Sequence, residues 1–411
     1  MILPKLAWRS LWKNRRRTLI TMTMISVGFA LALISLGIAD GFHNQMIRNA
    51  VRLGSGNLTV EHKGYPDEPS NDKLVSEASV LRDRILEIPG IRNVSERIIV
   101  MGLIYTAENS AGVAVFGVDP ASDMTRKSLE PEIIDGRYLE VDDKRGVLIG
   151  ADLARRLKAS VGDKAVVMAQ DSSGQISSQL VRVRGVFETG INEMDGYVAQ
   201  VNLPLARALL GVSEGATQLA VFLDNEKQQA RVKEEIEPLI REPDAEVFDW
   251  EDVMPDLVLF VQMDNAGTYI FMGIIMVVVA LGILNTILMS VLERTREFGL
   301  MVALGMDPRR LLRLVLLETT FLSIVSLGVG AILGFGVHLY FAEHGFDMGF
   351  ASKEQLTMAG AVFDSVVHSE LAPARVLFLL GIVFSVTLAV GIYPALRAAR
   401  VDPVRAITKF Q

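Results

Sequence analysis

The sequence predicts an α-helical membrane protein with four transmembrane helices and one large α+β domain of two lobes outside the membrane. Three observations support this fold class. Hydrophobic residues make up 50% of the 411 residues, and they are concentrated in four blocks long enough to cross a bilayer, which takes a helix of about 20 residues. Basic residues gather at the flanks of these blocks. Between the first two blocks, residues 41–265 have the composition of an ordinary globular domain.

The four apolar blocks define the expected spans. An amphipathic, cytoplasmic N-terminus of residues 1–17 precedes the first span at 18–40. The other three spans are expected at about 269–292, 311–339 and 375–396. The first block is longer than the apolar region of about 7–15 residues that a signal peptide carries, so we expect it to stay in the membrane.

The charges beside the spans predict their orientation. Lysine and arginine dominate before the first span, between the second and third spans, and after the fourth. The loop between the third and fourth spans is acidic and holds the single lysine Lys353. Because cytoplasmic loops carry an excess of basic residues, both termini are expected in the cytoplasm and residues 41–265 outside.

The external domain alternates between strand-like and helix-like patterns. In the first lobe we expect a strand at 57–62, a helix at 75–88 and a hairpin of 97–105 with 112–118. The second lobe is expected from Gly136, with a helix at 148–157, strands at 164–170, 179–187 and 220–223, and a helix at 226–241. Residues 250–265 are expected to form an amphipathic stalk that enters the second span.

The sequence argues against several kinds of chemistry. It has no cysteine, so disulfides, thiolate catalysis and cysteine-bound zinc are excluded. No GxxxxGK[ST], HExxH or GxSxG motif is present, and the five histidines lack metal-ligand spacing. The net charge of −7 argues weakly against a nucleic-acid partner. We therefore expect a non-catalytic chain without a cofactor or a metal.

Polar residues within the spans have two interpretations. Glu318 of the third span either takes part in a proton relay or has a structural role, which we prefer from its place near the cytoplasmic face. In that role it would snorkel to the membrane surface, cap a packing contact or pair with a neighbouring helix. Asn285 of the second span is expected to hold two helices together. The third span also contains glycines that we interpret as close helix packing and not as a nucleotide fingerprint: Gly328, Gly330, Gly334 and Gly336.

The short loop between the second and third spans carries the most information about function. Residues 293–305 alternate in charge, continue with apolar residues at helical spacing and end at a glycine, which is typical of a short amphipathic helix. Such a helix either lies on the lipid surface or fits a groove on a cytoplasmic partner. In the second case, Phe298 and Met301 would be apolar anchors, while Arg296 and Glu297 would give directional pairing.

Two segments resemble a known family. NTILMSVLERTREFGLMVALGMDPRRLLRLVLLETTFL at 285–322 and YPALRAARVDPVRAI at 393–407 resemble the FtsX-like permease signature of the MacB and lipoprotein-releasing branch of ABC transporters. ISVGFALALISLGIADGFHNQM at 25–46 resembles the lipoprotein-releasing (LolC/LolE) permeases in particular. The residues that match the coupling and tail motifs are Arg296, Glu297, Gly299, Pro394, Arg397 and Pro403.

This resemblance implies an architecture and a set of partners. Residues 41–265 would form a MacB-like periplasmic core domain, and 266–411 an FtsX-like permease domain in a bacterial inner membrane. A separate ABC ATPase homodimer would dock on the coupling helix 293–305, and a second permease chain, identical or paralogous, would complete the membrane unit. The implied ATPase-coupling residues are Glu293, Arg294, Arg296, Glu297, Phe298, Gly299 and Met301.

The expected function is mechanotransmission, in which ATP hydrolysis by the partner drives work in the periplasm. Release of lipoprotein or another amphipathic cargo is our preferred interpretation. Efflux of small hydrophobic compounds and a transmembrane signalling scaffold are the alternatives. A lipid-handling permease would need an apolar surface, expected around Ile34, Leu36, Ile270 and Phe271. The turn Asp171–Gly174 is either a hook for a lipoprotein chaperone or, as its composition favours, a plain solvated turn.

Overall fold

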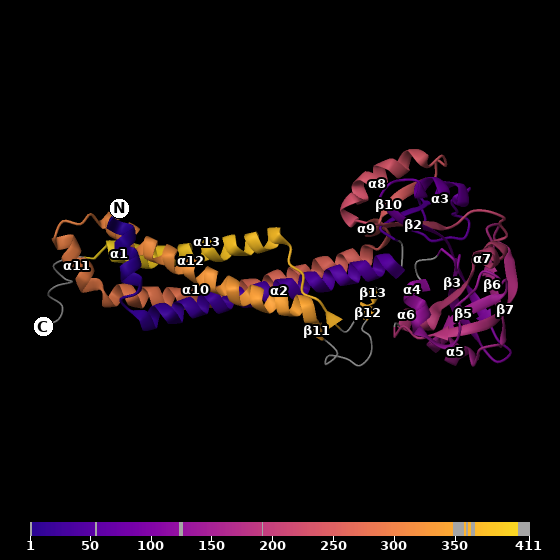
Figure 1. Cartoon of the computed structure of the whole chain (residues 1–411), viewed down its shortest axis with the longest axis horizontal. Helices are drawn as coiled ribbons and strands as arrows, with labels where there is room; N and C mark the ends of the chain where they lie inside the picture. The colour runs from indigo at the N-terminus through magenta and orange to yellow at the C-terminus, as the bar shows by residue number, and fades with distance from the viewer. Residues whose placement is uncertain are drawn as a thin grey trace. The chain divides into compact units, whose positions relative to one another are not determined.

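A computed structural model describes residues 2–53, 56–122, 126–190, 192–347, 357–358, 361–362 and 366–401. The chain divides into two compact units. The helical unit comprises Met1–Asn44, Gln262–Met348 and Val366–Gln411, and the domain comprises Gln45–Val261 and Gly349–Ser365. Figure 1 labels their elements.

Four helices are long and apolar enough to cross a membrane, which confirms the predicted number. They are α2 (Arg15–Leu53), α10 (Pro255–Glu293), α12 (Pro308–His344) and α13 (Pro373–Ala399). Each contains one of the expected spans and extends beyond it. The helical unit also holds α1 (Ile2–Leu11), α11 (Thr295–Ala303) and the short pair β11 (Phe346–Asp347) and β14 (Val366–Val367).

The long helices pack through apolar side chains and close glycine contacts. Phe29 and Leu33 of α2 are buried against residues of α10, α12 and α13. A Cβ on Gly330 of α12 would lie 2.7 Å from the carbonyl oxygen of Ser26, so only glycine allows this approach. Gly334 likewise faces α2. The same prediction is wrong for Gly328 and Gly336, which face open space because they lie on other sides of the helix.

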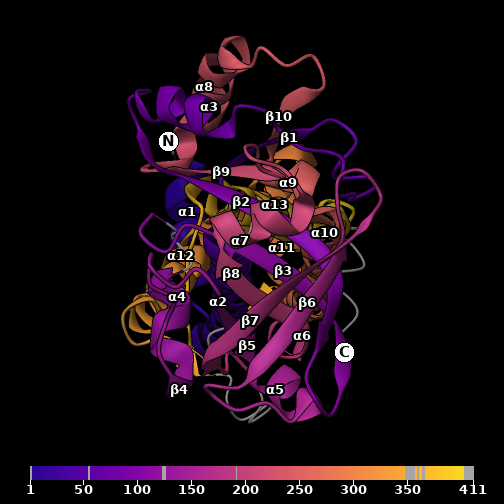
Figure 2. The same ribbon diagram turned by 90° about the vertical axis from the view of Figure 1, so that its right-hand side faces the viewer.

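The domain is built on one ten-stranded sheet with small helices around it (Figure 2). Its strands are β1 (Leu58–His62), β2 (Ile91–Tyr105), β3 (Ser110–Val118), β4 (Ile133–Gly136), β5 (Gly146–Gly150), β6 (Lys164–Gln170), β7 (Ile176–Phe187), β8 (Val198–Asn202), β9 (Gln218–Leu223) and β10 (Ala245–Asp249). Its helices are α3 (Ala78–Leu86), α4 (Arg126–Leu129), α5 (Ala151–Leu157), α6 (Asn192–Tyr197), α7 (Leu203–Leu210), α8 (Gln229–Ile236) and α9 (Trp250–Val253). The short pair β12 (Thr357–Met358) and β13 (Ala361–Val362) belongs to the same unit.

The long strand β2 divides this sheet into two lobes. Its first half, up to Arg97, pairs with β9, which continues through β1 to β10 as an open sheet. Its second half pairs with both β3 and β6, and the order β2–β3–β8–β5–β7–β6 closes into a ring of six strands. A ring leaves no free edge among these strands, which removes a template for aggregation.

The structure confirms some of the elements predicted from the sequence and contradicts others. Strand β6 has the predicted bounds, and the hairpin of β2 and β3 is confirmed. The predicted helix at 148–157 is wrong in its first part, because residues up to Gly150 form β5 and the helix begins at Ala151. A short apolar run fits a buried strand as well as a helix. The helix expected at 226–241 is reduced to α8 between two 3₁₀ turns, the second of which contains Pro238.

Candidate functional site

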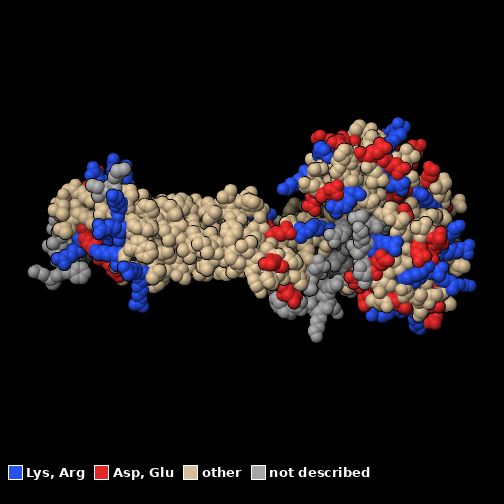
Figure 3. Space-filling view, in the orientation of Figure 1, with Lys and Arg blue, Asp and Glu red and all other residues tan. Residues whose placement is uncertain are grey.

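The short helix α11 lies at the end of the helical unit where charged residues gather, beyond a wide uncharged band (Figure 3). Local residues define its ends. The Thr295 hydroxyl donates to the carbonyls of Val291 and Leu292, which satisfies the last turn of α10. Gly305 adopts a φ of +93° after α11. The Asp307 carboxylate then accepts a hydrogen bond from the Arg309 backbone and caps α12.

One face of α11 is buried within the helical unit. Phe298 is fully buried, in a cluster with Ala7 of α1, Leu311 of α12 and Ala395 of α13. The Arg294 guanidinium lies 4.9 Å from the centre of the Phe298 ring, within the range of a cation–π contact. This apolar contact anchors α11 to three other helices of the same chain.

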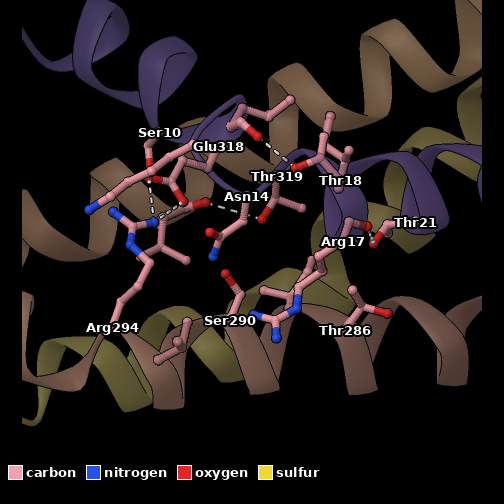
Figure 4. A pocket seen from close by; sticks show the side chains of 16 residues that line it. Ser10, Asn14, Arg17, Thr18, Thr21, Thr286, Ser290, Arg294, Glu318 and Thr319 are labelled. Carbon is pink, nitrogen blue, oxygen red and sulfur yellow. Dashed lines mark hydrogen bonds and ion pairs between the residues drawn. The ribbon is translucent and has the colours of Figure 1, made fainter.

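A buried ion pair joins the α10–α11 junction to α12. The Arg294 guanidinium donates to both carboxylate oxygens of Glu318 at 3.1–3.2 Å, and the two side chains are only 12% and 17% exposed. Figure 4 shows the pair beside a small pocket of about 70 Å³ whose walls carry Ser10, Thr18, Ser290 and other polar groups. Of the structural roles that the sequence leaves open for Glu318, the structure shows pairing with a neighbouring helix.

Two exposed ion pairs connect α11 and the end of α10 to the N-terminal segment. Lys13 donates to Glu297, and Arg17 donates to Glu293. The hydrogen bond from Lys13 lowers the pKa of Glu297, and Arg294 adds to this effect. Exposed pairs of this kind contribute at most about 1 kcal/mol each. Their importance is geometric, because they connect the N-terminal segment to the end of α10 and to α11.

The opposite face of α11 is exposed and mixed in character. Arg296, Leu300, Ala303 and Leu304 are exposed and follow helical spacing, so they form one stripe. Leu300 is 54% exposed and Leu304 is 81% exposed. We call this set the α11 stripe.

The seven predicted coupling residues differ in how far they are exposed. Glu293 and Arg296 are exposed, while Glu297, Arg294 and Met301 are partly covered. Phe298 and Gly299 are buried, so the expected role of Phe298 as an outward anchor does not fit its position, and Met301 packs beside the same cluster. The sequence pattern missed Leu300 and Leu304, although their spacing of four residues from Arg296 and from each other was a usable signal.

A second feature lies between α2 and α10, away from α11. An apolar groove of about 510 Å³ is lined by residues that include Ile34 and Phe271, as expected, and also Leu31, Phe42 and Ile275. Leu36 is instead buried among the helices, and Ile270 is exposed without lining the groove. Asp264 at the groove is paired with the buried His43 at 2.8 Å.

The turn at Asp171–Gly174 links β6 and β7 and is bonded internally. Asp171 accepts hydrogen bonds from the backbone of Ser173 and Gln175, and from the Ser173 hydroxyl. These bonds, led by the Ser173 hydroxyl, lower the pKa of Asp171. Such a pattern is typical of a self-contained Asx turn. Among the residues that the structure describes, no cluster of three or more His, Asp or Glu side chains is placed to hold a metal ion.

Two family models match the chain. The MacB-like periplasmic core domain matches residues 18–239, and the FtsX-like permease C-terminal matches residues 269–403. The periplasmic region of MacB from Actinobacillus actinomycetemcomitans aligns with a TM-score of 0.37 and 14% identity, over 50% of this chain and 93% of that one.

Curated relatives match along nearly the whole chain. The pyoverdine export ATP-binding/permease protein PvdT of Pseudomonas fluorescens is 25% identical over 98% of this chain and 58% of its own length, so the chain spans about three fifths of that relative. The lipoprotein-releasing system transmembrane protein LolC of Neisseria meningitidis is 19% identical over 95% of this chain and 93% of its own length. The chain belongs to the family of FtsX-like permeases that carry a MacB-like periplasmic core domain.

Proposed function

We propose that the chain is the permease subunit of an ABC transporter, and that an ATPase in a separate chain docks on the α11 stripe. The observation that carries this proposal is the two-sided nature of α11. Its inner face is anchored by Phe298 and by the Arg294–Glu318 pair, while its outer face presents two exposed leucines beside Arg296. Exposed apolar residues with a charged neighbour are typical of a docking surface.

The proposed mechanism is mechanotransmission. A force on α11 reaches α10 directly and α12 through the buried pair, because breaking that pair would leave a charge without a partner. Helix α10 contains 39 residues, so it is a rod of about 58 Å at 1.5 Å per residue. Long continuous helices therefore carry movement away from α11 without a channel opening through the chain. The chain itself is a non-catalytic subunit, and its partner hydrolyses ATP.

Lipoprotein or another amphipathic molecule is the cargo that we propose. The groove lined by Ile34, Phe42 and Phe271 has the apolar walls that an acyl chain needs, with the polar Asp264 at its margin. The similarity to LolC along most of both chains supports this cargo. Export of a smaller compound is the second candidate, and the similarity to PvdT favours it.

The proposed assembly is a pair of permease chains, identical or paralogous, with an ATPase homodimer. We propose that it lies in a bacterial inner membrane with both termini and α11 in the cytoplasm. The basic residues that gather near α1 and α11 support this orientation. A reporter inserted at Asp171–Gly174 is expected outside the cytoplasm, and labelling from the cytoplasmic side would overturn the orientation.

Co-purification with the native ATPase tests the docking proposal. Leu300→Asp combined with Leu304→Asp is expected to lose the ATPase, because each change places a charge in an apolar contact. Ile176→Asp, at a residue of β7 that is 76% exposed, is the matched control and should retain it. Retention of the ATPase by the double variant would refute docking on the α11 stripe.

A charge swap separates docking from internal pairing. Glu297→Lys alone should abolish stimulation of the ATPase while the chain still inserts into the membrane. Adding Lys13→Glu restores an ion pair between the two positions within the chain. Recovery in the double variant would assign Glu297 to internal pairing, whereas continued loss would assign it to contact with the ATPase. Unchanged stimulation and co-purification in Glu297→Lys would refute its part in coupling.

A further inference from the structure

A second, polar groove lies at the same end of the helical unit as α11. It has a volume of about 760 Å³ and lies between the start of α2 and the last turns of α10. Three consecutive arginines contribute to its walls, together with amide, hydroxyl and apolar side chains. Its lining residues are Asn14, Arg15, Arg16, Arg17, Ile20, Asn285, Thr286, Met289 and Glu293.

The groove carries an excess of positive charge. Three arginines and one glutamate leave two positive charges on its walls. Glu293 is already paired with Nη2 of Arg17, while Nη1 of Arg17 is buried and has no hydrogen-bond partner. Arg15 and Arg16 are exposed and form no ion pair with any residue that the structure describes. The groove thus offers the guanidinium groups of Arg15 and Arg16 to an anion.

The side chain of Asn285 extends the polar lining of the groove along α10. Asn285 is exposed and forms no hydrogen bond to another helix among the described residues, so it does not join two helices of this chain as predicted. It lies eight residues before Glu293, which is about 12 Å along the helix. An amide facing lipid tails without a partner is costly. A ligand with polar atoms at this depth would remove that cost.

We propose that the groove binds the phosphate headgroup of an anionic phospholipid. Arg15 and Arg16 contact the phosphate, and Asn285 donates to an ester carbonyl. The glycerol region lies against the exposed side chains of Ile20 and Met289, which are 51% and 49% exposed. Met289 lies between Glu293 and Asn285 on α10, so the acyl chains continue deeper than Asn285. Basic pockets between transmembrane helices are a known way to hold anionic headgroups.

The charge of the groove favours a lipid over a second protein chain. Burying two uncompensated arginines in a protein interface is unfavourable unless the partner supplies acids at matching positions. A phospholipid brings its own negative charge and its own apolar tails, so it complements both the arginine wall and the apolar residues. The proposal concerns this groove alone, and it stands or falls separately from docking on the α11 stripe.

Native mass spectrometry of the purified full chain, titrated with phosphatidylglycerol in a neutral detergent, tests the proposal. Arg15→Gln with Arg16→Gln is expected to lower the affinity for phosphatidylglycerol about 25-fold, at about fivefold for each arginine. Arg309→Gln with Arg310→Gln is the matched control, since these arginines are exposed near α11 but do not line the groove. An equal loss in the control would show diffuse surface attraction and overturn the site.

Two further arms identify the ligand. Asn285→Leu leaves the charge unchanged and is expected to lower the affinity for phosphatidylglycerol about fivefold. Unchanged lipid binding together with loss of binding to a second protein chain would assign the groove to a protein interface. Glycerol 3-phosphate at millimolar concentration should not displace the lipid, because it lacks acyl chains, and full displacement would show a site for soluble phosphate. Arg15→Lys with Arg16→Lys keeps the charge and should retain most of the binding, which separates loss of charge from loss of folding.

Discussion

The two units each contain a buried carboxylate, and the two carboxylates have different partners. In the helical unit, Glu318 meets the guanidinium of Arg294, so both charges are paired. In the domain, Glu61 of β1 is 2% exposed and accepts a hydrogen bond from the amide of Gln218 at 2.9 Å, while its second oxygen has no hydrogen-bond partner. Burial raises the pKa of Glu61 to about 7. One carboxylate has a guanidinium partner and fastens helices, and the other has only a neutral amide as its partner within a sheet.

This difference shows what each unit requires. A charged pair is strongly directional, and at the α10–α11 junction it fixes a short helix against two long ones. A buried glutamate beside an amide has no opposite charge nearby, so burial favours its protonated, neutral form. The stability of the helical unit therefore depends on the pairing of specific residues. In the domain, the contribution of Glu61 to stability depends on the pH.

The largest expected effect is loss of the buried pair. Glu318→Leu removes the buried partner of Arg294, which keeps only the more exposed Glu297 at 3.3 Å, and should lower the free energy of unfolding of the helical unit by about 3 kcal/mol. Trp8 and Trp12 report on this unit, since Trp8 contacts Phe321 of α12 at 5.8 Å between ring centres. Their fluorescence during denaturation in detergent is the measurement.

A double variant shows whether pairing is the cause. Arg294→Met with Glu318→Leu removes both charges and should recover most of the loss, because an apolar pair needs no partner. A double variant as unstable as Glu318→Leu would show that the site needs the shape of these side chains and not their charges.

The next effect is a pH dependence of the domain. Because the pKa of Glu61 is raised from 4.5 to about 7 in the folded chain, its stabilising contribution is complete below pH 4.5. That contribution is lost as the pH rises through 7. The free energy of unfolding should fall by about 3 kcal/mol over this interval, at about 1.4 kcal/mol per pKa unit.

Glu61→Gln is the matched variant for this pH profile. It cannot titrate, so its unfolding should no longer contain this step, and it should be more stable than the parent chain above pH 7. Trp250 of α9 reports on the domain when Trp8 and Trp12 are changed to Phe. Identical pH profiles for the parent and the variant would show that Glu61 does not become neutral.

The smallest effect is expected at the exposed pair of Lys13 and Glu297. Lys13→Gln should cost less than about 1 kcal/mol at low salt and almost nothing at high salt, because the pair is screened by solvent. The measurement is thermal unfolding at two salt concentrations. A loss as large as that in Glu318→Leu would remove the distinction between the buried and the exposed pairs.

Much of the architecture could be predicted from the sequence because its signals are local. Bilayer-length apolar blocks predict α2, α10, α12 and α13, and a short apolar run that ends at the turn Asp171–Gly174 predicts β6 within its bounds. The closure of the β2–β6 ring could not be predicted, since pairing between distant strands leaves no local pattern. Likewise, an amphipathic pattern shows that α11 has two faces but not which one is buried.

The candidate site shows the same limit. The family resemblance implies coupling roles for Glu293, Arg294 and Glu297, and all three form ion pairs in the structure. The partners Lys13 and Arg17 come from a segment about 280 positions earlier in the chain, so only the fold brings them together. Phe298 is predicted as an apolar anchor for a partner, but the structure places it in the interior cluster of the helical unit.

The most direct test of mechanotransmission is a distance measurement across the chain during ATP hydrolysis. Because the sequence has no cysteine, spin labels can be attached at Leu304→Cys, directly after α11, and at Ile176→Cys of β7 without a background. The account predicts that trapping the partner ATPase in its ATP-bound state shifts the distance between the two labels, and that Glu297→Lys abolishes the shift. An unchanged distance while the bound ATPase turns over would contradict it.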